Sequence, residues 1–201
     1  HSRYQELDLS NSDIEFIKIG EVCEIINGST PSKKNKKNWE NGNVAWFTIE
    51  DFREQGYIIT DTKQKITQLA LNETSISILP PRSVLLCCTA SVGEIAFSQI
   101  PLTTNQQFNG LVIEEEYENQ LLPEFLFWVS TNLKKELIRN SGTTSFNYIS
   151  VAKLKEIEIP FPPLREQEII INEFNGYQKV IDGCRQVIEN FKPIIDIDQL
   201  W

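Results

Sequence analysis

Seven apolar residues near the C-terminus recur at a spacing that alternates strictly between four and three. They are Ile170, Phe174, Tyr177, Ile181, Cys184, Ile188 and Phe191. This spacing puts all of them on one face of an α-helix and is typical of a coiled-coil seam. The pattern predicts a helix over residues 164 to about 191, roughly 42 Å long at ~1.5 Å per residue.

A helix with this sequence needs something to pack against. Gly176 and Gly183 lie inside it, and each costs about 1 kcal/mol relative to alanine. We therefore expect the seam to pair with a second helix. The alternative is that the helix packs back on its own domain.

The rest of the chain has the composition of one globular domain, with 40% hydrophobic residues among 201. We predict an α/β (α+β) domain over residues 14–160, after a linker at 1–13 and before a proline-rich hinge. Residues 193–201 are a tail or the start of a second repeat, since Asp198 and Trp201 repeat the spacing of Asp13 and Phe16. The patterns predict strands at 43–49, 83–89, 94–98, 108–113 and 156–159, and helices at 62–71, 123–139 and 151–154. Residues 14–26 form a strand or a helix.

The sequence offers little for catalysis. Its one histidine is His1, so most hydrolytic sites would lack their usual base. Its four cysteines have no metal-ligand spacing and are expected to be buried free thiols. We expect no metal, no cofactor, no membrane span and a cytoplasmic location. The absence of methionine suggests a fragment or a processed chain.

The net charge is −9, yet most basic residues lie between residues 29 and 160 and occur in bunches. Such bunches can form a local phosphate-binding patch on an acidic protein. Several loops add polar side chains that can contact phosphates or base edges. The candidate DNA-binding residues are Ser29, Thr30, Lys33, Lys34, Lys36, Lys37, Lys63, Lys65, Asn105, Gln106, Gln107, Thr143, Thr144, Ser145 and Asn147.

Six segments appear in an order similar to a known family. They are IGEVCEIINGSTPS (19–32), NWENGNVAWFTIEDF (38–52), LPPRSVLLCCTASVGEIAFS (79–98), TTNQQFNG (103–110), GTTSFNYIS (142–150) and IEIPFPPLREQEII (157–170). The chain resembles the target-recognition domain of the specificity subunit of type I restriction-modification systems, over nearly its whole length.

The resemblance implies that the domain reads one half of a bipartite double-stranded DNA target. It implies that the long helix pairs antiparallel with that of a second copy or repeat. It also implies docking of a DNA adenine methyltransferase subunit, possibly with a restriction subunit, and catalysis in those partners. The chain would then be a half-subunit, an excised domain or part of a fused methyltransferase. Base-reading residues are expected between the shared segments, at 33–38, 52–65 or 145–148. The alternative function is a protein-interaction scaffold that oligomerises through the helix.

Overall fold

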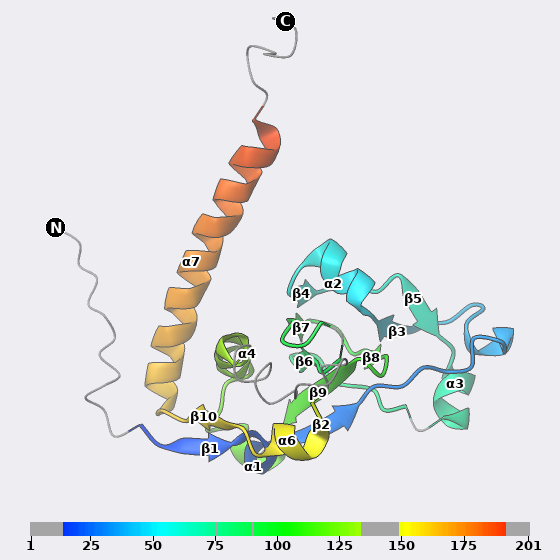
Figure 1. Cartoon of the computed structure of the whole chain (residues 1–201), viewed down its shortest axis with the longest axis horizontal. Coiled ribbons are helices and arrows are strands. Elements are labelled where there is room, and N and C mark those ends of the chain that lie inside the picture. Colours follow the sequence, from blue (N-terminus) through cyan, green and yellow to red (C-terminus); the bar gives the residue numbers. More distant parts are fainter. Residues whose placement is uncertain (1–13, 75, 90, 134–148, 192–201) are drawn as a thin grey trace, which may run out of the picture.

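A mixed α/β head carries one long C-terminal helix, α7 (Leu164–Asn190), in the computed structural model (Figure 1). The structure describes residues 14–74, 76–89, 91–133 and 149–191, and we use "head" for the described residues up to 163. The predicted fold class is confirmed. The elements of the head are β1 (Phe16–Lys18), α1 (Ile19–Val22), β2 (Cys23–Asn27), η2 (Lys36–Asn38), β3 (Val44–Phe47), α2 (Ile49–Gln55), β4 (Ile58–Ile59), β5 (Gln64–Ile66), α3 (Gln68–Glu73), β6 (Val84–Cys87), β7 (Ile95–Ser98), β8 (Thr103–Thr104), β9 (Phe108–Ile113), η3 (Glu115–Tyr117), α4 (Pro123–Asn132), α6 (Val151–Lys155) and β10 (Glu158–Pro160).

The centre of the head is a five-stranded sheet in the order β2-β9-β6-β7-β4. All pairs are antiparallel except β4 with β7. Every residue of β6 is buried, because its two sides belong to different cores. Val84 and Leu86 pack in the core that also holds α4 and α6, while Leu85 and Cys87 pack against β3 and α2. A strand covered on both faces reads as a continuous apolar run, as in VLLC.

A second sheet, β5-β3-β8, carries the loops that matter for the site. β3 pairs antiparallel with β5 and parallel with β8. One face of this sheet is covered by a small core made of Trp46, Ile66, Ala70 and Ile76. The register aligns Trp46 with Gln64, so these two side chains lie on the same face.

Two predicted elements, the strand at 43–49 and the helix at 62–71, differ from the structure. Residues 62–71 were predicted as one helix, but β5 occupies the first half and α3 the second. The strand predicted to reach residue 49 ends at Phe47, and α2 begins at Ile49 after its cap residue Thr48. Thr48 and Asp51 form a capping box that starts α2, and the second Asp51 oxygen accepts a hydrogen bond from the Lys63 N–H at 2.8 Å. Pairing of residues 64–66 with β3 thus overrides their helical pattern.

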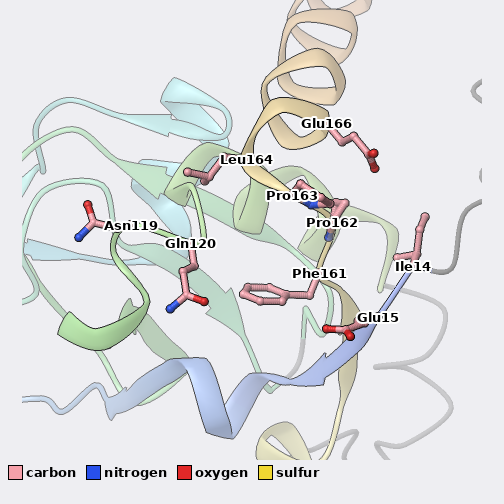
Figure 2. Close-up of a pocket in the computed structure, with 9 residues that line it drawn as sticks. All are labelled: Ile14, Glu15, Asn119, Gln120, Phe161, Pro162, Pro163, Leu164 and Glu166. Atoms are coloured by element: carbon pink, nitrogen blue, oxygen red, sulfur yellow. The ribbon is translucent and has the colours of Figure 1, made fainter.

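The two ends of the head meet where α7 begins. β1 pairs antiparallel with β10, and residues 161–163 lead directly into the helix (Figure 2). Gln167, in the first turn, is completely buried. Its side-chain oxygen Oε1 accepts a hydrogen bond from the Leu122 N–H at 2.8 Å. Its side-chain nitrogen Nε2 donates to the backbone carbonyls of Gln120 and Pro162, both at 2.8 Å. One side chain therefore ties the helix start to the loop before α4 and to its own hinge.

The first half of α7 packs on the head and the second half does not. Phe174 stacks on Trp128 of α4, with ring centroids 5.3 Å apart, and Ile170 packs against the same core. From Val180 to the end of the helix every residue is exposed. The alternative interpretation, packing on the head, therefore holds for the first two seam residues, Ile170 and Phe174, and pairing of the exposed remainder with a second helix stays a prediction. The described part of α4 starts with Pro123 as predicted, while Leu137 and the rest of that predicted helix lie outside the described residues.

The prediction that all four cysteines are buried holds for three of them. Cys23, Cys87 and Cys88 are buried, whereas Cys184 is exposed on α7. All four are free thiols. Burial raises the pKa of Cys23 to about 12 and that of Cys88 to about 12. Cys184 is exposed because no described part of the head covers the second half of α7.

Replacement of Gln167 by leucine should destabilise the chain strongly. Leucine has a similar size but leaves the Leu122 N–H and two carbonyls without partners, which should lower the free energy of unfolding by about 3 kcal/mol. Chemical denaturation measures this. Gln178→Leu is the matched control, because that amide bonds only to Asp182 on the helix surface. Equal effects of the two substitutions would contradict the anchoring role of Gln167.

Candidate nucleic-acid interface

Two of the predicted lysine bunches come together at one hollow, of about 480 Å³, between the loop that contains η2 and strand β5. The hollow lies at the end of the head far from α7, where Figure 1 shows β5 and α3. We define this lysine hollow by its lining residues, Lys33, Lys36, Trp39, Glu40, Lys63, Gln64 and Lys65. Four ammonium groups around an open depression can hold the phosphates of a nucleic acid backbone.

Two tryptophans hold Lys33 in place over this hollow. Its Nζ lies 5.7 Å from the ring centroid of Trp39 and 5.5 Å from that of Trp46. The two rings meet edge to face at 4.9 Å. Their indole N–H groups donate to backbone carbonyls, Trp39 to Ser32 at 3.2 Å and Trp46 to Ser29 at 3.0 Å. The ring contacts therefore restrain an ammonium group that would otherwise move freely on the surface.

The lysines on the β5 side are paired with exposed acids. Lys63 lies 2.6 Å from Glu54, and Lys65 lies 3.1 Å from Asp61. The hydrogen bond to Glu54 raises the pKa of Lys63, and hydrogen bonds from the Thr62 backbone and then Lys65 lower the pKa of Asp61. Exposed pairs of this kind contribute little to stability because solvent screens them, so a phosphate can replace the acid.

The lysines of the η2 loop differ from those of β5. No carboxylate among the described residues pairs with Lys33, Lys34, Lys36 or Lys37. Asn35 caps η2 by accepting from the Lys37 N–H, which fixes the backbone of this loop. The loop thus presents four ammonium groups outside any ion pair with a described residue, with Glu40 as the carboxylate among the residues that line the hollow.

The predicted polar residues near Gly28 also meet, but they largely bond to one another. The Thr30 hydroxyl donates to the side-chain oxygen of Gln106, and the Ser29 backbone N–H donates to the backbone carbonyl of Thr104. A Cβ on Gly28 would lie 1.9 Å from the Asn105 carbonyl oxygen, so only glycine fits there. The Asn105 amide donates to Gln107 at 3.1 Å. These side chains build the loop.

The polar run that begins at Thr103 is less exposed than the sequence suggested. Thr103 and Thr104 are buried in β8, and the Thr103 hydroxyl donates to the Ala45 carbonyl at 3.0 Å. Gln106 is the exposed residue of the following loop. The two threonines that precede the candidate residues Asn105, Gln106 and Gln107 are therefore buried and not available to contact DNA. The predicted contacts Thr143, Thr144, Ser145 and Asn147 lie outside the described residues, as do Lys134, Lys135 and Arg139.

The exposed part of the predicted seam is wider than predicted. Its later members Tyr177, Ile181, Cys184, Ile188 and Phe191 are exposed, as are Val180 and Val187, which the prediction missed. Val187, Ile188 and Phe191 keep 69%, 74% and 71% of their surface accessible. The 3-4 spacing from Tyr177 through Val180 and Cys184 to Val187 carried the missing signal.

A second hollow, of about 470 Å³, lies at the base of α7 and has a different chemistry (Figure 2). It is lined by Ile14, Glu15, Asn119, Gln120, Phe161, Pro162, Pro163, Leu164 and Glu166. Its only charged groups are carboxylates, which repel phosphate. Across the described ranges, no cluster of histidine, cysteine or acidic residues could hold a metal ion, and no helix is long and apolar enough to cross a membrane.

Comparison with known proteins gives a consistent picture. Residues 11–189 match the family model of the type I restriction modification DNA specificity domain. The chain is 30% identical, over its full length, to 46% of the MjaIX specificity subunit of Methanocaldococcus jannaschii. It is 31% identical, over 79% of its length, to 39% of the EcoprrI specificity subunit of Escherichia coli.

Solved structures share the fold. One, from work on complex assembly and conformational transition of the type I R-M system, superposes with a TM-score of 0.70 at 22% identity, over 92% of this chain and 43% of that one. The HsdS subunit of Thermoanaerobacter tengcongensis gives 0.65 at 20% identity, over 92% and 42%. The chain thus spans less than half the length of these relatives. It belongs to the family of type I restriction-modification DNA specificity domains.

Proposed function

We propose that this chain recognises one half of a bipartite double-stranded DNA target, as a specificity subunit or domain of a restriction-modification complex. The observation that carries the proposal is the match of residues 11–189 to the DNA specificity family, which spans both the head and α7. The chain itself uses no cofactor and performs no catalysis. A DNA adenine methyltransferase subunit, with a restriction subunit, supplies the chemistry in the cytoplasm.

The lysine hollow supports DNA as the ligand of the head. The protein has a net charge of −9, but the η2 loop and β5 concentrate positive charge at one end. Phosphate contacts from such a patch position a protein on DNA without reading its sequence. Local charge thus outweighs the overall acidity at the surface that meets the duplex.

The exposed half of α7 supports pairing with further helices. A two-stranded coiled coil needs about two apolar positions in seven, whereas this half offers about three. One flank suits the antiparallel helix of a second copy or second repeat, and the other suits a helix of the methyltransferase subunit. The 27 residues of α7 span about 40 Å, close to the ~34–36 Å of one DNA turn. Two heads on such helices would reach two half-sites.

The general test is binding of the 201-residue chain to a randomised duplex pool at a series of salt concentrations. For DNA recognition, log K should fall by about 0.9 per phosphate neutralised, per unit of log salt. Binding that ignores salt would contradict a phosphate-contacting interface.

Changing Lys33, Lys34, Lys36 and Lys37 together to serine should weaken binding to every DNA sequence about equally. The salt slope should flatten by a few units, because each lost phosphate contact removes about 0.9. Stability should change little, since these side chains are exposed. Fluorescence anisotropy measures the slope, and Lys179→Ser on α7 is the control. An unchanged slope would remove the η2 loop from the interface.

Changing Ile181 and Ile188 to aspartate should dissociate a helix pair and leave the head folded. The two carboxylates would be buried in the seam, whereas the core of the head lies elsewhere. Sedimentation velocity at micromolar concentration compares this variant with the wild type. Gln186→Asp with Asn190→Asp is the matched control, because both residues are exposed on the opposite face. A wild-type monomer would show that α7 pairs only with a different chain or a second repeat.

A further inference from the structure

Gln64 occupies an unusual place on β5. The strand QKI alternates its faces, so Gln64 and Ile66 point to the same side. Ile66 is completely buried in the small core beneath that face, and Gln64 lies opposite Trp46 in the register. An apolar residue would suit this face. Instead a half-exposed amide lies at the edge of the core, where it lines the lysine hollow.

The amide of Gln64 forms no hydrogen bond with any described residue, whereas several other glutamines of the head bond to the protein. Gln55 holds the backbone of Thr60 and Asp61. Gln107 accepts from Asn105. The carboxamide of Gln64 therefore keeps both a donor and an acceptor available at the hollow.

The backbone that carries Gln64 is held firmly. The Thr62 hydroxyl donates to the Gln64 carbonyl at 2.7 Å and accepts from the Trp46 N–H at 3.1 Å. The buried carboxylate of Asp51 accepts from the Lys63 N–H at 2.8 Å. Residues on both sides of the strand thus fix its position. A side chain on a fixed backbone loses little entropy on binding, which suits it to reading a base.

We propose that Gln64 is a base-reading residue, and that it contacts the edge of an adenine in the major groove. Glutamine can donate to N7 and accept from N6–H of adenine at the same time. The flanking phosphates are held by lysines on both sides of the hollow, Lys33 and Lys36 on one and Lys63 and Lys65 on the other. These contacts set how far the Gln64 amide reaches into the groove. The inference rests on the proposed recognition of DNA and deepens it by naming the side chain that reads sequence.

The experiment begins with selection of duplexes from a randomised pool by the wild-type chain. Binding of the selected duplex and of its single-base variants is then compared for the wild type, Gln64→Ala and Gln64→Glu. The wild type should prefer A·T at one position by about 10- to 100-fold. Gln64→Ala should lose this preference alone and keep the salt slope. Gln64→Glu should shift it toward cytosine, whose N4 group donates to a carboxylate.

The control is Gln68→Ala, which removes an exposed glutamine on α3 outside the hollow. Circular dichroism and thermal unfolding verify that each variant stays folded. If Gln64→Ala keeps every base preference, or weakens all sequences equally, Gln64 does not read a base and the inference falls while DNA recognition stands. If the wild type shows no salt-dependent DNA binding, the proposed function falls as well.

Discussion

The buried amide of Gln167 determines how the two parts of the molecule are joined. It satisfies backbone groups of the loop before α4 and of the hinge at Pro162, so α7 leaves the head in one direction. The stack of Phe174 on Trp128 extends this attachment by two further turns. A bipartite reader depends on such a joint, because the distance between two heads is defined only if each helix is rigidly fixed to its own head. The helix length that would separate two heads is therefore counted from Gln167 and not from the start of the exposed seam.

Much of the fold could be predicted because the signal is local. The seven-residue repeat predicts α7, and the apolar runs VLLC and IAFS predict β6 and β7. The prediction for the segment from Thr48 to Ile66 was wrong for a physical reason. Its outcome depends on a capping box, on pairing with β3 and on Asp51 binding the backbone of Lys63, and two of these three are contacts between distant residues. Short elements adopt the structure that such contacts allow, whatever their own propensity.

The candidate site was predictable in its parts but not in its assembly. The sequence shows two lysine bunches some thirty residues apart, and only the β3–β5 pairing reveals that they share one hollow. Trp39 gave no signal of its own, because an isolated aromatic residue is common anywhere, and Gln64 lay within the range 52–65 expected to read bases without being singled out there. The sequence could not show that the side-chain amides of Asn105 and Gln107 bond to each other. Which polar side chains remain available for a ligand depends on tertiary contacts.

Acidic and basic side chains line hollows at opposite ends of the head. The acidic segment at η3 contacts the base of α7 through the rings of Tyr117 and Phe161, and the hollow there is lined by the carboxylates of Glu15 and Glu166. The lysines lie at the opposite end of the head (Figure 1). The carboxylates of the second hollow disfavour a polyanion there, whereas the lysine hollow favours one, so charge would bias the orientation of a bound duplex before any base is read. Because the joint at Gln167 is rigid, orienting the head also orients the exposed half of α7. If the lysine hollow holds the duplex as proposed, charge at that end would also set where a partner helix lies relative to the duplex.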